Sequence, residues 1–409
     1  MLNNNHSKNN NNRSGGFKNS NSKQSKQFYS TNVNSSTAAG AASEELSDNS
    51  MMKYSIPDKY YQNMNMASLY SYMDKYEFSG KQWKKWFENY QKSGKENLKM
   101  MRQVVQEGTF HAFRNLYFKP DREVISTQAV GEELLEDNII SINRDDLMES
   151  CVNTKFYSNH SAAQSILETL KTPKLFKNTQ VLVMEGDCLE AALLLQKNAK
   201  IEENIVRKVA VLNMASAKRP GGGYKTGAGA QEENLFRRTS LAFSLEDIEK
   251  WDKKRTGKYP LDEFGGVYVP NVTVIRGSEL KGYPFLDKIY KTDVVCVAAY
   301  SNPDLDPKNA NRFHSSLVEN VKKKLRLIFA MAIEHNVTTL VLSSLGCGAY
   351  KNPPQHMAAL FNQVIQEFDG HFEQVVFAIY NDNNAKNAEG NVVPFEREFK
   401  TKAIPVEWK

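Results

Sequence analysis

Long apolar runs, cysteine pairs and a strong charge of one sign are all missing from this sequence of 409 residues. No apolar stretch approaches the ~18 residues that a membrane span needs, and the N-terminus lacks the apolar centre of a secretory signal. The four cysteines are widely spaced and form no Cys-x-x-Cys pair, which argues against a zinc ribbon or a disulfide-stapled scaffold. We therefore expect an intracellular protein of the nucleus or cytoplasm, without membrane contact.

The formal net charge of +6 is too small for a protein dedicated to nucleic acids, so we expect no direct sequence-specific nucleic-acid binding. The seven histidines lack the spacing of metal ligands, among them His160, His314, His335 and His356. We expect them to be structural or surface residues, and we predict neither a metal nor a cofactor.

The chain changes character twice before its main domain. Residues 1–50 hold twelve asparagines and no acidic residue before Glu44, which predicts a disordered low-complexity tail. Their basic, serine-rich composition leaves a mitochondrial presequence open, although the segment contains a single arginine. Residues 51–118 show helix-like spacing, for example around Gln82–Phe87. This extension is expected to pack on the main domain, with a membrane-surface helix as the alternative reading.

Residues 119–409 alternate between short apolar strands and helices, which predicts an α/β domain with a mixed, mostly parallel sheet and helices on both faces. The segment around Pro270-Asn271 is expected to be a β-hairpin. Lys322-Lys323-Lys324 is expected to be a solvated helix face. The expected strands cover residues 181–184, 209–212, 267–269, 272–275, 294–297, 339–342 and 375–379, and the expected helices cover 188–196, 317–332 and 357–368.

The most informative segment is glycine-rich and follows the strand at 209–212. Gly221-Gly222-Gly223 lets backbone N–H groups converge on an anion at the carboxyl end of a strand, and a helix expected from about Gln231 would add its positive dipole end. The spacing fits neither the dinucleotide fingerprint nor the P-loop. A diphosphate site and a flexible connector both remain open on glycines alone.

Two adjacent carboxylates, Glu232 and Glu233, favour the site. Each would repel the phosphate that the glycines attract, which is easier to understand if a carboxyl group is needed for chemistry. Adjacent helical residues point about 100° apart, so the pair cannot flank one bond as paired glycosidase carboxylates do. One glutamate is therefore expected to act in turn as acid and base, and the other to orient a hydroxyl.

A second glycine loop follows the strand at 339–342. Gly346 and Gly348 permit close backbone approach, and Tyr350 supplies an aromatic face for a sugar or base. Cys347 is a candidate nucleophile, but no histidine lies near it in sequence. We expect it to contribute backbone or packing instead.

Together these motifs resemble the bacterial-type (microbial) poly(ADP-ribose) glycohydrolase family, which is built on a macrodomain. The family signature is three glycines, six to eight residues, then Gln-Glu-Glu, and here seven residues separate Gly221–Gly223 from Gln231–Glu233. The flanks Leu212–Ala217 and Leu235–Leu241 also match. Gly346–Pro353 resembles the second phosphate loop, with Tyr350 in place of the usual Phe and Pro354 in place of a frequent acidic residue. The resemblance covers about residues 95–385.

The resemblance implies a glycoside hydrolase that cleaves ribose–ribose bonds of poly(ADP-ribose) and releases ADP-ribose, with Glu233 as general acid/base and Glu232 orienting ribose hydroxyls. It also implies activity on poly(ADP-ribosyl)ated proteins, a part in ADP-ribosylation turnover such as the DNA damage response, and a monomer. The implied substrate-binding residues are Asp187 at the adenine, Asn213 at the distal ribose, Gln231 of the signature, and Gly221, Gly222, Gly223, Gly346, Cys347, Gly348, Ala349 and Tyr350 around the diphosphate.

Two other functions stay open. A macrodomain can bind ADP-ribose without cleaving it, although such a reader has no need of the second carboxylate. An enzyme acting on mono-ADP-ribosyl adducts would use the same signature.

Overall fold

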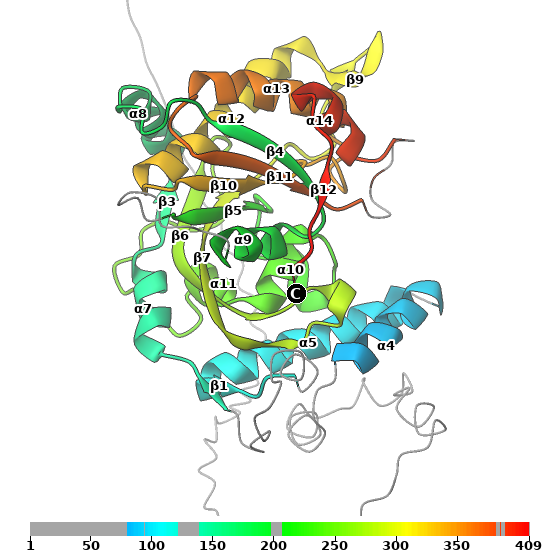
Figure 1. Ribbon diagram of the computed structural model, residues 1–409. Helices are drawn as coiled ribbons and strands as arrows, with labels where there is room; N and C mark the ends of the chain where they lie inside the picture. Colours follow the sequence, from blue (N-terminus) through cyan, green and yellow to red (C-terminus); the bar gives the residue numbers. More distant parts are fainter. Residues whose placement is uncertain are drawn as a thin grey trace, which may run out of the picture. The chain divides into compact units, whose positions relative to one another are not determined.

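The computed structural model describes residues 80–93, 95–121, 139–197, 207–381, 385 and 389–408 (Figure 1). The tail predicted over residues 1–50 and the predicted extension before residue 80 lie outside the described residues. All described residues belong to one unit, Met64–Lys409. The proposed division of the chain into tail, extension and main domain stays a prediction.

Eight strands form the main sheet in the order β12-β4-β11-β10-β5-β7-β6-β3. Neighbours from β12 to β7 are parallel, whereas β6 and β3 add an antiparallel edge. The predicted mixed, mostly parallel α/β sheet is confirmed. The strands are β3 (Lys155–Tyr157), β4 (Gln180–Glu185), β5 (Val209–Met214), β6 (Gly266–Arg276), β7 (Phe285–Val297), β10 (Thr339–Leu342), β11 (Gln374–Ile379) and β12 (Ile404–Pro405).

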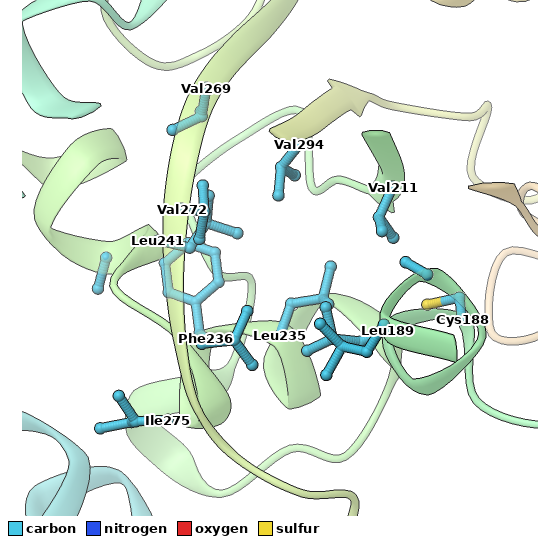
Figure 2. Close-up of a cluster of buried hydrophobic side chains, with 14 of the residues drawn as sticks. Cys188, Leu189, Val211, Leu235, Phe236, Leu241, Val269, Val272, Ile275 and Val294 are labelled. Carbon is cyan, nitrogen blue, oxygen red and sulfur yellow. The ribbon is translucent and has the colours of Figure 1, made fainter. Parts of the chain in front are cut away.

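Helices cover both faces of this sheet because alternate side chains of its strands point to opposite sides. In β5, Val209 and Val211 enter one hydrophobic cluster, and Ala210 and Leu212 enter the other. The first cluster contains α9 and α10, and the second contains α12 and α13 (Figure 1). Figure 2 shows side chains of α9 and α10 directed at valines of the sheet. The helices of the two faces are α7 (Arg144–Val152), α8 (Asn159–Thr169), α9 (Cys188–Lys197), α10 (Gln231–Arg238), α11 (Leu241–Glu246), α12 (Ser315–Glu334), α13 (Pro354–Glu367) and α14 (Val392–Phe399).

The predicted hairpin around Pro270-Asn271 is wrong. β6 is a single strand that pairs with β7, and its register shifts between Val269 and Val272. Proline has no N–H for the ladder, and Asn271 adopts φ +52° and donates its N–H to the Asp293 carboxylate at 2.8 Å. The turn residues therefore make a bulge inside a strand instead of a reversal of the chain.

The lysine run on α12 was also only partly anticipated. Lys323 is exposed, but Lys324 is buried and its ammonium donates to the carbonyl of Glu263. Burial lowers the pKa of Lys324 to about 8. The prediction of a fully solvated face is wrong at this residue because the loop before β6 covers it.

Two helices precede the main sheet in the chain, α4 (Gly80–Ser93) and α5 (Lys95–Asn115). α5 continues through Gly108 and packs on α10: Gln106 donates to the carbonyl of Phe236 at 3.3 Å, and Thr109 donates to that of Arg237 at 2.6 Å. The prediction that this region packs on the main domain is confirmed for α5. None of the described helices is long and apolar enough to span a bilayer.

Smaller elements complete the described chain. β1 (Tyr117–Phe118) pairs with β2 (Ile140–Ser141), and β8 (Leu305–Asp306) pairs with β9 (Asn309–Phe313). Two short 3₁₀ helices, η1 (Tyr224–Thr226) and η2 (Glu279–Lys281), lie next to the glycine segment and in the β6–β7 connection.

Candidate functional site

The glycine segment connects the carboxyl end of β5 to the start of α10, and Gln231 fixes that start. Its side-chain oxygen accepts the N–H of Met214 at 2.9 Å, and its amide nitrogen donates to the carbonyl of Leu212 at 2.5 Å and to the sulfur of Cys188 at 3.2 Å. The amide thus joins the first residue of α10 to β5 and α9. This arrangement sets the position of the two following glutamates.

Glu232 is buried and folds back onto the chain that precedes it. Its Oε2 accepts the N–H of Ser216 at 2.8 Å, and its Oε1 accepts the N–H of Gly221 at 3.1 Å. Burial raises the pKa of Glu232 to about 8, and the charge of Glu233 adds to this, while the two backbone hydrogen bonds oppose it. The raised pKa favours the protonated form of Glu232 more than in an ordinary glutamate, which lessens the repulsion expected between adjacent carboxylates.

Glu233 has one carboxylate oxygen in a hydrogen bond and one without a partner among the described residues. Oε1 accepts the N–H of Gly223 at 2.9 Å. Oε2 is buried and has no hydrogen-bond partner among the described residues. A buried polar atom without a partner is costly, and such atoms in native proteins call for a ligand or a water. Glu233 is thus the member of the pair with one oxygen that no described residue engages.

Gly222 lies against both carboxylates, and its backbone conformation and its surroundings each require a glycine. Gly222 adopts φ +52°, and a Cβ atom there would lie 2.7 Å from Oε1 of Glu233 and 2.9 Å from Oε2 of Glu232. Gly221 adopts φ +70° beside the ring of Tyr224. The three glycines therefore wrap their backbone around the two glutamates.

Asn213 lies on the side of β5 that faces α10, in line with Val209 and Val211. Its amide nitrogen approaches the sulfur of Cys296 on β7 at 3.5 Å and also faces the carboxyl of Glu232. Its Oδ1 is buried and has no partner among the described residues. The structure thus brings Asn213, Glu232 and Glu233 together.

The second glycine loop follows β10, which is the parallel neighbour of β5, so both loops leave the same edge of the sheet. Gly346 adopts φ +75°, and Asn352 secures the loop by donating to the carbonyls of Gly346 at 3.2 Å and Tyr300 at 2.7 Å. Tyr350 is half-buried near Ser216 and Glu232: burial raises its pKa, and the charge of Glu232 adds to this. Gly348 and Ala349 connect these residues along the same loop.

Cys347 is buried in the sheet face covered by α12 and α13, and burial raises its pKa. A neutral thiol is a poor nucleophile, which agrees with the expectation that Cys347 contributes packing and backbone. The four cysteines are all buried and unpaired.

Asp187 follows β4, separated from β5 by β11 and β10. Both of its carboxylate oxygens accept from Nη1 of Arg238 at 2.8 Å, and Arg238 is the last residue of α10. The chain after β12 passes close by, since a Cβ atom at Gly186 would lie 2.7 Å from the Cβ atom of Val406. α10 thus carries the two glutamates in its first turn and holds Asp187 from its last.

Sequence reasoning missed the support behind the glycine segment. Arg102 on α5 donates to both carboxylate oxygens of Glu279 at 2.7 and 2.8 Å, and a Cβ atom at Gly229 would lie 2.2 Å from its guanidinium carbon. Arg237 is fully buried and donates to the carbonyls of Ala228 and Arg102. The sequence signal for these contacts was weak, because arginine is usually exposed and α5 lies over a hundred residues earlier.

Comparisons with known proteins agree with this geometry. A family model described as the catalytic domain of microbial-type poly(ADP-ribose) glycohydrolase (PARG) matches residues 122–277, which contain the whole glycine and Gln-Glu-Glu segment. Over these residues the chain is similar to the microbial-type PARG family. No curated protein sequence matches the chain.

Solved structures of poly(ADP-ribose) glycohydrolases share the fold. The enzyme of Thermomonospora curvata is 24% identical, with a TM-score of 0.56 over 73% of this chain and 98% of that one. The same enzyme bound to the inhibitor ADP-HPD gives 24% identity and a TM-score of 0.54 over 72% and 98% of the two chains. The Deinococcus radiodurans enzyme in complex with ADP-ribose is 24% identical, with a TM-score of 0.50 over 63% of this chain and 99% of that one.

Proposed function

We propose that this chain is a poly(ADP-ribose) glycohydrolase that hydrolyses ribose–ribose O-glycosidic bonds and releases ADP-ribose. The observation that carries the proposal is Glu233, whose Oε1 is anchored to the N–H of Gly223 while its buried Oε2 has no partner among the described residues. A protein that only binds ADP-ribose has no use for such a carboxyl group. The family match over residues 122–277 and the relatives bound to ADP-HPD and ADP-ribose support the same activity.

The substrate contacts follow from the two loops. Gly221–Gly223 and Gly346–Tyr350 leave the same edge of the sheet and would enclose the diphosphate. The second loop would supply backbone N–H groups, whereas Gly221 and Gly223 already donate theirs to the two glutamates and would give the diphosphate room for close approach. Asp187, oriented by Arg238, would receive the adenine amino group, and Asn213 would contact the distal ribose. Gln231 would support the substrate site indirectly by fixing the start of α10, because its amide is hydrogen-bonded to β5 and α9.

The reaction needs two proton transfers, one from Glu233 and one to it. Protonated Glu233 gives its proton to the bridging oxygen as the bond from that oxygen to the anomeric carbon breaks, which leaves an oxocarbenium-like ribose. Water then forms a bond to the anomeric carbon, and the Glu233 carboxylate takes the proton that the water loses. Glu232, held by Ser216 and Gly221, would orient the ribose hydroxyls.

We further propose that the acceptors are poly(ADP-ribosyl)ated proteins and that the chain acts as an intracellular monomer. The buried, unpaired cysteines support a reducing compartment.

Glu233→Gln tests the function because it keeps the shape of the side chain and removes the transferable proton. Release of ADP-ribose from purified polymer, followed by chromatography, should fall about 10²–10⁴-fold, while calorimetry should show ADP-ribose binding retained. Glu319→Gln, at an exposed residue of α12 paired with Arg326, is the matched control and should cleave normally. Near-normal cleavage by the Glu233 variant would remove Glu233 from the mechanism. If the wild type binds ADP-ribose without cleaving polymer, the protein is a non-catalytic ADP-ribose binder. If it clears mono-ADP-ribosylated protein without cleaving polymer, its substrate is the mono-ADP-ribosyl adduct.

A further inference from the structure

Three buried polar atoms near the carboxyl end of β5 have no hydrogen-bond partner among the described residues. They are Oδ1 of Asn213, Oε2 of Glu233 and the hydroxyl of Tyr259. The first two belong to residues of the site already described, but Tyr259 lies in the loop between α11 and β6, outside both glycine motifs. Of the three, only the phenol always carries a proton to donate.

The backbone ties the loop of Tyr259 to the chain next to Ser216, whose N–H holds Glu232. Leu261 donates its N–H to the carbonyl of Ala217 at 2.8 Å, which ties this loop to the segment between β5 and the glycines. The Tyr259 ring packs edge-on against Phe156, with ring centroids 6.4 Å apart. The ring is therefore fixed at the start of the glycine segment.

The surroundings of the hydroxyl are those of the ribose end of the site. Burial raises the pKa of Tyr259 well above its usual value, and the neighbouring Cys296 and Glu232 add to this. Cys296 is the residue whose sulfur approaches the amide nitrogen of Asn213 at 3.5 Å. The Tyr259 hydroxyl is thus a neutral donor held near Asn213 and Glu232.

We propose that Tyr259 is a further substrate-contacting residue, whose hydroxyl donates a hydrogen bond to a ribose hydroxyl next to the scissile bond. A ribose presents two neighbouring hydroxyls, each of which can donate and accept. Asn213 Oδ1 can accept from one hydroxyl while Tyr259 donates to the other. The inference rests on the proposed function, because it presumes that an ADP-ribose unit occupies the site.

An open buried donor makes a specific prediction for the unliganded protein. Removing a hydroxyl that has no partner sacrifices no protein hydrogen bond, so Tyr259→Phe should leave the melting temperature unchanged or raise it. The same variant should lose one hydrogen bond to the ligand, which corresponds to about three- to tenfold weaker binding of ADP-ribose. A purely structural tyrosine would show the opposite pattern.

The test measures melting temperature and calorimetric binding of two probes, ADP-ribose and ADP, for the wild type, Tyr259→Phe and Tyr290→Phe. ADP lacks the distal ribose, so its affinity should not change in the Tyr259 variant. Tyr290, half-buried on β7 with its hydroxyl on Asp287 at 3.3 Å, is the matched control and should bind both probes as the wild type does.

The outcomes separate the two proposals. If the wild type binds no ADP-ribose, the proposed function itself fails. If the wild type binds ADP-ribose and the Tyr259 variant binds it equally well, the role of Tyr259 is overturned. Equal weakening of ADP and ADP-ribose, or a larger drop in melting temperature than for Tyr290→Phe, would show that Tyr259 holds the loop instead of the ribose, and would also overturn it.

Discussion

Replacing Gly222 by alanine adds one methyl group at the point where the glycine segment touches both glutamates. At φ +52° an L-residue loses about 1–2 kcal/mol relative to glycine. The added Cβ would also lie 2.7 Å from Oε1 of Glu233 and 2.9 Å from Oε2 of Glu232. Those oxygens accept from the N–H groups of Gly223 and Ser216, so moving both away gives up two hydrogen bonds at about 0.5–1.5 kcal/mol each.

The free energy of unfolding should therefore fall by about 2–5 kcal/mol in Gly222→Ala. Polymer cleavage should fall about 100-fold even where the variant is folded, because Glu233 is displaced from its anchor. Gly282→Ala is the matched control: Gly282 adopts φ +82° at the end of η2 and is not among the residues whose N–H groups hold the two glutamates, so only the conformational cost of about 1–2 kcal/mol should appear there. Denaturant unfolding and polymer cleavage are measured for both variants. Equal stability losses in the two, together with normal cleavage by the Gly222 variant, would refute the close contact between glycine and carboxylates.

Three other measurements probe the same site. The raised pKa of Glu232 means that its protonated form is the one favoured by folding, so its contribution to stability is complete below pH 4.5 and is lost as the pH rises through about 8. Glu232→Gln should remove up to roughly 5 kcal/mol of this pH dependence in unfolding curves, and an unchanged slope would contradict it. Arg102→Ala should weaken ADP-ribose binding and lower the melting temperature, because Glu279 loses its ion pair and Gly229 loses the guanidinium packed against it. Normal affinity in calorimetry would show that α5 does not support the glycine segment. Early products of polymer digestion should be single ADP-ribose units, because the resemblance to bacterial-type enzymes, which cleave from the chain end, extends over Asn213–Glu233 with no added segment in the motif. The unit linked to protein should leave slowly, since its leaving group is not a ribose hydroxyl. Abundant oligomers at the first time points would exclude cleavage from the chain end.

The sequence by itself determined the sheet and the motif. Apolar runs such as Thr339–Leu342 predicted buried parallel strands because both faces of such strands must be apolar, and β10 has these bounds. The spacing of Gly221–Gly223 and Gln231–Glu233 identified the loop and the helix start, since φ > 0 and a helix N-terminus are local properties. Local rules failed where a partner strand decided the outcome: the turn residues Pro270-Asn271 became a bulge because β7 continues past them.

Only the tertiary structure decided which glutamate is open. Glu232 and Glu233 are chemically identical neighbours in sequence, and their difference comes from the backbone N–H groups of Ser216 and Gly221, which engage both oxygens of one, while Gly223 engages a single oxygen of the other. The support by α5 and the buried hydroxyl of Tyr259 depend in the same way on segments that are distant in the chain. Hydrogen bonding and burial at such contacts are set by the packing of several elements at once, and no periodicity or spacing within one segment encodes them.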